Sequence, residues 1–355
     1  MTFAHHGYIG FACSYVPLAV IDAAGYVPWR VLPMSECPDQ AGQLLHDNLC
    51  PHVKRIIDRV LADDLPQLEG MVFINSCDAM RRMADAWQQI RPSDKTIMLD
   101  LPSTQEPASL AYFAQEVRRL AQTLADWGDR PLSVNAIRES TRRYNALGRL
   151  LMQANERLRD GTLEGGSARM QALYNQASTE PVEASIDRMQ AILASPATTR
   201  QADPGVPVFL FGNVLPDPEV FTLFEDCGAF IAGDDFCTGS RLFTENAREV
   251  ADDPWQFLAE ELLLHPPCAR TFDPARPGQI ARDVLQKAQA CRAQGVIGYT
   301  LKFCDPYLAR LPLVRAAMKA ANLPVLLLEG DCTLRSIGQQ RTRIEAFIEM
   351  LRESK

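Results

Sequence analysis

Short apolar runs that alternate with amphipathic segments dominate the first hundred residues of the chain. An apolar run of about four to eight residues is typical of a buried parallel strand, and apolar residues three or four apart indicate a helix. Residues 71–74 form such a run, polar residues follow it, and Met80, Met83 and Trp87 then continue at helical spacing. The pattern predicts strands at 8–11, 27–32, 71–74 and 95–101 and helices at 18–24, 52–61 and 80–87.

Helical periodicity without strand-like runs marks the stretch from about 106 to 195, and the polar stretch 198–205 is typical of a linker. Strand and helix signals then alternate again. They predict strands at 206–211, 229–232, 295–303 and 324–328, a loop at 233–239, and helices at 219–227, 254–264, 278–293 and 341–353.

Strands that alternate with helices favour parallel sheets joined by right-handed crossovers. We therefore expect an α/β protein with two doubly wound, Rossmann- or flavodoxin-like domains and a helical connecting region. The expected boundaries are 1–105 for the first α/β domain, 106–200 for the helical region and 201–355 for the second α/β domain.

Composition narrows the class of protein. Of the 355 residues 47% are hydrophobic and 23% are charged, as in soluble globular proteins. A net charge of -8 and the lack of a Lys/Arg run argue against nucleic-acid and membrane partners. The amino terminus lacks a basic segment followed by an uninterrupted apolar stretch, so we expect neither a signal peptide nor a membrane anchor, and a cytoplasmic protein.

The ten cysteines carry the most chemical information. A large chain in a reducing compartment does not need structural disulfides, and no pair is spaced CxxC, so zinc-ribbon and ferredoxin-type motifs are absent. Cys77 lies where a strand hands over to a helix, at the sheet edge where α/β proteins bind ligands. Five further cysteines also follow strands or lie in turns, giving the set Cys13, Cys50, Cys77, Cys237, Cys268 and Cys304. Six thiols suit iron–sulfur chemistry better than zinc, which takes four ligands, although buried structural thiols remain an alternative.

Several short motifs carry a resemblance that runs along nearly the whole chain. They are Cys-Ser-Tyr-Val-Pro (13–17), Ala-Ala-Gly (23–25), Asn-Leu-Cys-Pro (48–51), Ser-Cys-Asp (76–78), Asp-Asp-Phe-Cys-Thr-Gly-Ser-Arg (234–241), Lys-Phe-Cys-Asp-Pro (302–306) and Gly-Gln-Gln-Arg-Thr-Arg (338–343). Together they resemble the 2-hydroxyacyl-CoA dehydratase and benzoyl-CoA reductase superfamily, which also contains the double-cubane cluster proteins.

This resemblance implies a low-potential iron–sulfur subunit of a homo- or heterodimer, charged by an ATP-hydrolysing [4Fe–4S] activator protein. The dehydratase pattern implies one [4Fe–4S] cluster on Cys50, Cys77 and Cys304. The double-cubane pattern adds Cys13, Cys237 and Cys268 and implies an [8Fe–9S] cluster in the cleft between the two domains.

Because all six cysteines are present, the double-cubane branch is favoured, with a small-molecule substrate. One alternative is a dehydratase or benzoyl-CoA reductase subunit with a single cluster, which acts on a CoA thioester. A second alternative, from another class, is a metal-free accessory subunit that binds a catalytic partner.

The sequence identifies no catalytic acid or base. His265 is a possible proton donor, Ser14 lies beside a proposed ligand, and Lys302 could lower a thiolate pKa or lie on the surface. Asp78 and Asp305 follow ligand cysteines and are interpreted as helix caps. The remaining candidates are Arg241, Arg341 and Arg343, for CoA phosphates, the activator or a solvated surface, and Cys332, as a substitute ligand.

Overall fold

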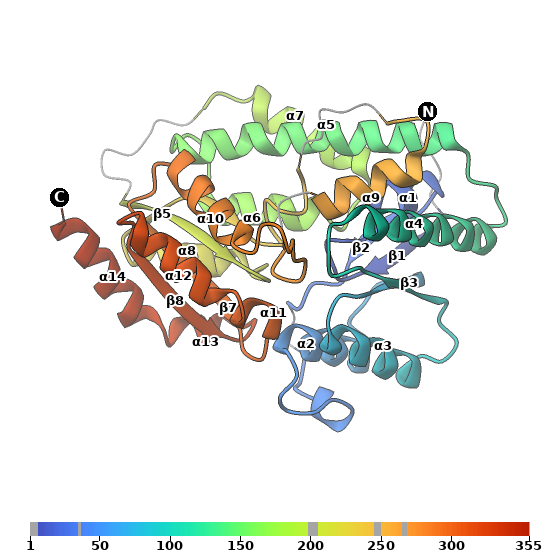
Figure 1. Cartoon of the computed structure of the whole chain (residues 1–355), viewed down its shortest axis with the longest axis horizontal. Coiled ribbons are helices and arrows are strands. Elements are labelled where there is room, and N and C mark those ends of the chain that lie inside the picture. The colour runs from blue at the N-terminus through green and yellow to red at the C-terminus, as the bar shows by residue number, and fades with distance from the viewer. Residues whose placement is uncertain (1–5, 35–36, 198–204, 245–249, 265–267, 355) are drawn as a thin grey trace.

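Two four-stranded parallel sheets form the framework of the computed structural model, which describes residues 6–34, 37–197, 205–244, 250–264 and 268–354 (Figure 1). The first sheet has the order β2-β1-β3-β4 and the second the order β6-β5-β7-β8, so both follow the same plan. The strands are β1 (Tyr8–Phe11), β2 (Val27–Arg30), β3 (Leu68–Asn75), β4 (Thr96–Asp100), β5 (Val206–Gly212), β6 (Ala229–Asp235), β7 (Gly295–Leu301) and β8 (Val325–Gly330). The predicted fold class is confirmed.

Alternating residues of β3 show how the first sheet is covered on both faces. Met71 and Phe73 pack against α2 (Pro51–Leu61) and α3 (Asp78–Ile90), whereas Val72 and Ile74 face α1 (Leu18–Ala23) and α4 (Pro107–Gly128). Successive side chains of a strand point to opposite faces, so a run of apolar residues needs a helix layer on each side. Figure 1 shows the sheet between α3 and α4.

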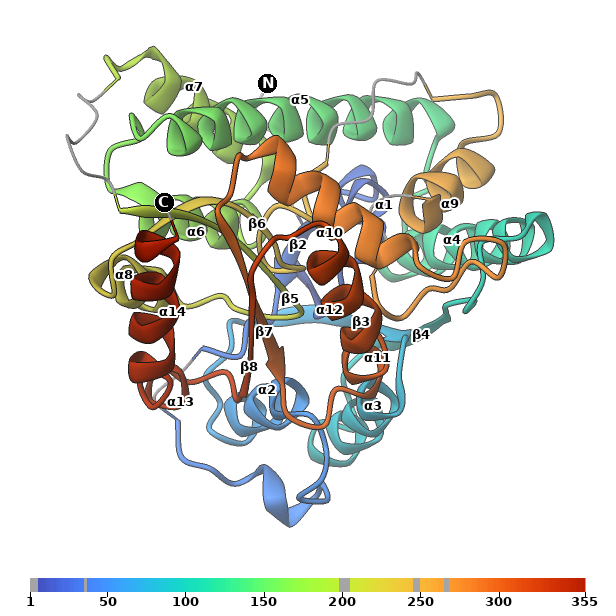
Figure 2. The same cartoon turned by 60° about the vertical axis from the view of Figure 1, so that its left-hand side comes forward.

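The second sheet is built in the same way. Phe209 and Phe211 of β5 pack against α10 (Gln279–Ala290) and α12 (Leu311–Ala320), and Val208 and Leu210 face α8 (Pro218–Asp226) and α14 (Arg341–Glu353) (Figure 2). This second face shares one continuous core with the α2 and α3 side of the first sheet. The two sheets are therefore packed into a single body.

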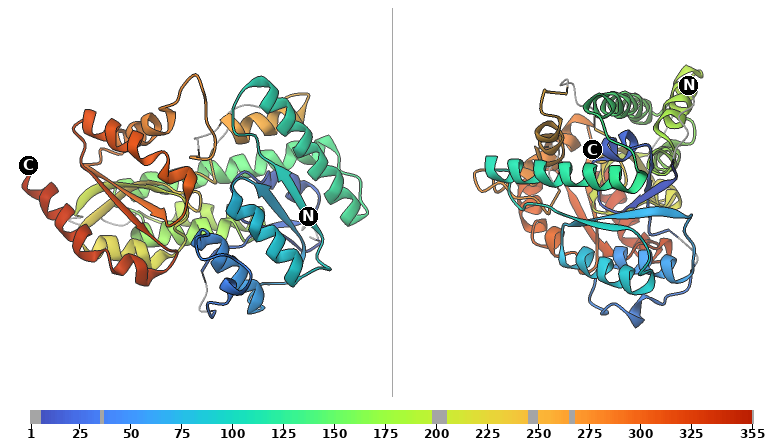
Figure 3. Two further views of the ribbon diagram at one scale, coloured as in Figure 1. Left: turned by 60° about the horizontal axis from the view of Figure 1, so that its bottom comes forward. Right: turned by 90° about the vertical axis from the view of Figure 1, so that its right-hand side faces the viewer.

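The helical region connects both units. Its elements are α4, α5 (Val134–Arg159), α6 (Gly166–Ala177) and α7 (Val182–Ala194). Helix α5 contacts both α1 and β6, and α6 packs on α8 (Figures 1 and 3). The helical region therefore packs on both α/β units. The expected linker at 198–205 lies, apart from Gly205, outside the described residues.

Two expectations for the second unit were wrong. A loop was expected from residue 233, but strand β6 continues through Asp235. The pairing of β5 with β6 shifts register before Gly233, and a side chain at Gly233 would collide with the Cys291 sulfur, so glycine allows the strand to continue there. Helix α12 was missed, although a parallel crossover from β7 to β8 requires one. Leu311, Val314 and Met318 give it helical spacing. The other short helices are α9 (Pro254–Leu264), α11 (Asp305–Leu308), α13 (Leu334–Gly338) and a 3-10 turn at Ala41–Gln43.

Gly212, the last residue of β5, is required by the close approach of β5 and β7. A Cβ atom there would lie 1.9 Å from the carbonyl oxygen of Tyr299, a backbone atom that cannot rotate away. We expect Gly212→Ala to lower the free energy of unfolding by about 3 kcal/mol, as overpacking of a core does. Urea denaturation checks this. Gly42→Ala is the control, because its Cβ would meet only Asp47 at 4.0 Å, and an equal loss in both variants would contradict the explanation.

Candidate metal centre

Three of the six cysteines singled out by sequence occupy the N-cap positions of helices. Cys50 precedes α2, Cys77 precedes α3 and Cys304 precedes α11. In each case the cysteine is followed by a helix whose first N–H groups lack intrahelical partners. The first backbone N–H groups of α2, those of His52 and Val53, act to lower the pKa of Cys50, and the N–H groups that follow Cys77 and Cys304 have the same effect, although burial outweighs it. None of these three cysteine side chains makes a capping hydrogen bond.

The other three cysteines lie in irregular segments. Cys13 follows β1, Cys237 follows β6, and Cys268 lies between α9 and α10. The thiol of Cys237 donates to the carbonyl oxygen of Asn213. Burial raises the pKa of Cys13 to about 12, and the neighbouring sulfurs of Cys268 and Cys237 raise it further.

Electrostatic interactions connect neighbouring thiols. Cys268 and Cys237 act to raise the pKa of Cys13, and Cys304 and Cys77 act to raise the pKa of Cys50. Burial is the largest cause that raises the pKa of Cys304 to about 12, and Cys268 and Cys77 also act to raise it. We call the three N-cap cysteines the capping trio (Cys50, Cys77, Cys304) and the three in irregular segments the loop trio (Cys13, Cys237, Cys268). The effect of Cys268 on Cys304 shows that the two trios are neighbours.

All six cysteines of the two trios line one cavity of about 270 Å³. Within the described ranges, no three His, Cys, Asp or Glu side chains converge closely enough to hold a single metal ion. The six thiols are therefore spread around the cavity wall and do not converge on one position. Thiolates are the usual ligands of iron–sulfur clusters, so this donor set fits a group with several metal atoms. Cys37, Cys227, Cys291 and Cys332 do not line the cavity.

Polar residues that the sequence analysis overlooked also surround this cavity. His52 lines it, and burial together with Arg30 lowers the pKa of His52 to about 3, so its imidazole is neutral. Its Nδ1 atom is buried and has no hydrogen-bond partner among the described residues. Arg30 is 1% exposed and donates to the carbonyl oxygens of Ala12 and Cys237. The sequence feature that could have identified His52 is its position two residues after Cys50, a proposed ligand.

Arg270 adds a positive charge to the cavity wall. Its guanidinium donates to the carbonyl oxygen of Leu101 at 3.0 Å, and its charge acts to lower the pKa of Cys77. A bound iron–sulfur cluster with several thiolates is anionic, so nearby arginines offset its charge. Neither Arg30 nor Arg270 could be predicted to lie here, because their contacts with Ala12, Cys237 and Leu101 depend on tertiary packing.

Arg241 is buried in an ion cluster instead of lying on the surface. Its Nε atom is 2.9 Å from Asp235 Oδ1, and Lys287 Nζ is 3.0 Å from the same oxygen. Burial acts to raise the pKa of Asp235, yet the two cations hold that pKa well below its usual range. The guanidinium lies 5.9 Å from the ring centre of Tyr307, and its charge acts to lower the pKa of Cys268.

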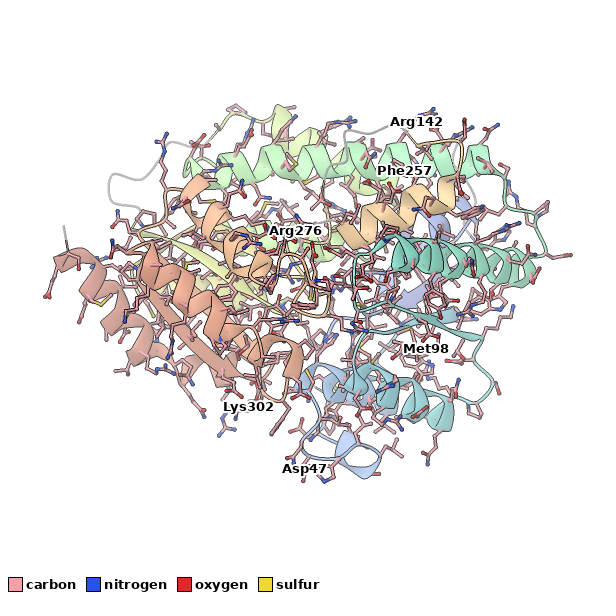
Figure 4. All side chains as sticks on the ribbon, viewed as in Figure 1. Asp47, Met98, Arg142, Phe257, Arg276 and Lys302 are labelled. Carbon is pink, nitrogen blue, oxygen red and sulfur yellow. The ribbon has the colours of Figure 1, made fainter. Side chains whose placement is uncertain are left out.

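The structure also places most of the other residues that were considered as candidates from the sequence. Ser14 lines the cavity, whereas Lys302 is exposed and does not, as its surface interpretation allows (Figure 4). His265 lies outside the described residues. The capping interpretation of Asp78 and Asp305 was wrong in detail, because the cysteines before them take the N-cap positions.

Each of these aspartates instead lies in a first helical turn, where its charge complements the helix dipole. Arg341 pairs with Glu345 at 3.5 Å, and Arg343 donates to the carbonyl oxygen of Leu327. Cys332 is buried beside Cys50 but outside the cavity.

No helix in the described part of the chain combines the length and the apolar character needed to span a membrane. Among solved structures, the complex of SsGBP with GDP covers 97% of this chain at 9% identity, with a TM-score of 0.24.

Sequence comparison gives a clear result. The family model described as "2-hydroxyglutaryl-CoA dehydratase, D-component" matches residues 13–351. The YjiM protein of Escherichia coli, named as a dehydratase subunit, is 25% identical, over 97% of this chain and 91% of that protein. The beta subunit of (R)-2-hydroxyglutaryl-CoA dehydratase from Acidaminococcus fermentans is 25% identical, over 97% and 92%.

A benzoyl-CoA reductase component of Thauera aromatica is 22% identical, over 90% of this chain and 84% of that protein. The family match extends over almost the whole chain and includes every cysteine of both trios. The chain therefore belongs to the 2-hydroxyglutaryl-CoA dehydratase D-component family and is an enzyme subunit of the dehydratase and benzoyl-CoA reductase type.

Proposed function

We propose that this chain is an iron–sulfur component that holds a double-cubane [8Fe–9S] cluster on both trios and takes part in the activator-driven reduction of a small substrate. Proteins of this family carry iron–sulfur clusters. The observation that carries the finer proposal is the arrangement of six cysteines around one cavity, three at helix N-caps and three in irregular segments. A double cubane needs three thiolates for each half, and the two halves must meet.

The protein's own residues would hold such a cluster by three means. The six cysteines of the two trios supply thiolates: Cys13, Cys50, Cys77, Cys237, Cys268 and Cys304. The N–H groups at the starts of α2, α3 and α11 stabilise negative charge on the capping trio. Arg30, which is buried, and Arg270 would offset the negative charge of the cluster. When bound, the cluster supplies electrons at low potential.

Because burial raises the pKa of most of these thiols, the metal-free protein carries them protonated near neutral pH. Ligands must be deprotonated to bind metal, so loading the site releases protons. Loading is therefore favoured as the pH rises.

A second candidate is supported by the names of the relatives. Both the Acidaminococcus and the Thauera relative are named for CoA thioesters, which favours an acyl-CoA substrate and a single [4Fe–4S] cluster on the capping trio.

Both names also describe subunits, so we propose that this chain works with a related partner subunit and with an ATP-hydrolysing activator. The metal-free accessory role has no observation in its favour beyond the ordinary burial of thiols.

Iron and acid-labile sulfide per chain, measured on anaerobically purified protein together with its EPR spectrum, separate these proposals. About eight irons per chain support the double cubane, and about four support the single cluster. Protein that stays free of iron after reconstitution would overturn both and leave the accessory role.

A further inference from the structure

Arg30, the last residue of β2, connects the two α/β units beside the loop trio. Its guanidinium group donates to the carbonyl oxygen of Ala12 at 3.3 Å and to the carbonyl oxygen of Cys237. Ala12 and Cys13 follow a strand of the first sheet, whereas Cys237 follows a strand of the second. One side chain therefore bonds the backbone beside Cys13 and at Cys237, two proposed ligands that belong to different units.

The guanidinium group is itself held in place. Arg30 pairs with Phe11 in the register of β1 and β2, and its backbone N–H donates to the carbonyl oxygen of Ser178 at 2.8 Å. The guanidinium carbon lies 5.9 Å from the centre of the Phe11 ring, within the range of a cation–π contact. Because the planar fork of an arginine is rigid, a shift of either ligand segment breaks one of its hydrogen bonds.

The positive charge of Arg30 has no counter-charge in the described part of the chain. The residue is 1% exposed, its Nε atom is buried without a hydrogen-bond partner, and no Asp or Glu of the described ranges forms an ion pair with it. Arg241 differs, because Asp235 Oδ1 lies 2.9 Å from its Nε atom. An unpaired buried charge is costly, so we expect an anion to bind near Arg30.

The cluster cavity is the place for that anion. Ala12 and Cys237, which accept the two hydrogen bonds, both line it. Burial raises the pKa of Cys13, and the charge of Arg30 acts to lower it, so this charge reaches the sulfur of a proposed ligand. Arg30 does not line the cavity itself and therefore acts through the residues of the wall.

We propose that Arg30 is a positioning residue for the loop trio: it holds Cys13 and Cys237 together across the two units, and an anionic cluster in the cavity supplies the counter-charge that its guanidinium group lacks. The inference rests on the proposed function, because the counter-charge is the cluster. It adds that Arg30 raises the reduction potential of the cluster, since a nearby cation stabilises the added electron.

Amide hydrogen exchange of the metal-free protein tests the positioning role without a cluster. The N–H groups of Val16 and Cys237 donate to the carbonyl oxygens of Cys13 and Asn213, so their exchange reports opening of the two ligand segments. We expect Arg30→Met to speed exchange at least about tenfold in both segments, as the loss of a hydrogen bond from a charged group does.

Arg157→Met is the matched control. Arg157 also donates to backbone carbonyl oxygens, those of Ile192 and Leu193, but it lies outside the cavity. The control is expected to change exchange in the two ligand segments less than about twofold, because its bonds hold other segments. Unchanged exchange in Arg30→Met, or an equal increase in both variants, would overturn the positioning role.

The reduction potential of the anaerobically loaded protein, followed by EPR, tests the counter-charge. We expect Arg30→Met to shift it by at least about 59 mV to more negative values, which is tenfold in the equilibrium constant for one electron. Arg30→Lys keeps the charge but not the rigid fork, so it should change the same constant less than about threefold. An unchanged potential in Arg30→Met, or an equal shift in Arg30→Lys, would contradict the counter-charge.

Iron and sulfide in the same samples separate this inference from the proposed function. Wild-type protein that takes up no iron would overturn the proposed function and the counter-charge with it, whereas the exchange data decide the positioning role in either case. Loss of iron from Arg30→Met but not from Arg30→Lys also supports the counter-charge. Should Arg30→Met not fold, as judged by circular dichroism, Arg30→Gln replaces it in both measurements with the same deciding outcomes, because its amide is neutral but still donates a hydrogen bond.

Discussion

Replacing Cys77 with serine is expected to strip the protein of most of its iron while leaving the fold intact. Cys77 caps α3 and lines the cluster cavity, so its sulfur is proposed to be one of six ligands. A hydroxyl is a poor substitute for a thiolate on iron. Activity with any substrate should fall more than about 100-fold, beyond the loss seen when only an outer-shell partner is removed.

Cys227→Ser is the matched control for this prediction. Cys227 is also buried but lies at the carboxyl end of α8, away from the cavity. Iron and sulfide content, the EPR spectrum and circular dichroism should be measured on both variants. If Cys77→Ser kept its full iron content and its spectrum, Cys77 would be a structural thiol and the ligand proposal would be wrong for it.

The second large effect is expected at Arg241. Arg241→Met removes one of two cations from Asp235, a residue that is 3% exposed and then depends on Lys287 alone. Breaking this buried ion pair leaves the Asp235 charge only partly compensated, so we expect the free energy of unfolding to fall by about 3 kcal/mol. Urea denaturation of the metal-free protein measures this without interference from cluster loss.

Arg341→Met is the comparison. Its ion pairs with Glu345 and Asp226 lie at the surface, where such pairs contribute at most about 1 kcal/mol. In the double variant with Asp235→Asn, part of the Arg241 loss should be recovered, since the unpaired charge is gone. A loss below about 1 kcal/mol in Arg241→Met would show that the cluster of charges does not stabilise the fold.

The sequence was sufficient to predict the fold and to select the six cysteines around the cavity, because both depend on local patterns. Carboxyl ends of parallel strands meet at one edge, so cysteines at strand ends were expected to gather there. That Cys77 rather than Asp78 occupies the cap could not be predicted, because both residue types are compatible with a helix start.

The main failure of the prediction from sequence concerned charged side chains that are buried in the structure. Arg30 and Arg241 look like ordinary surface residues in the sequence, and only the packing of both sheets shows that they are buried. The omission of helix α12 has a different cause. Its apolar spacing was present in the sequence, and the parallel pairing of β7 and β8 called for a crossover helix, but neither signal was used.

The distribution of ligands between the two sheets has a consequence for biosynthesis. Each trio combines cysteines from both units: Cys304 joins two residues of the first unit, and Cys13 joins two of the second. On the proposed ligation, no ribosome-bound fragment that ends before Cys304 can complete the capping trio. Metal insertion must therefore follow translation and folding of nearly the whole chain, and truncated products would stay colourless and be recognisable as incomplete.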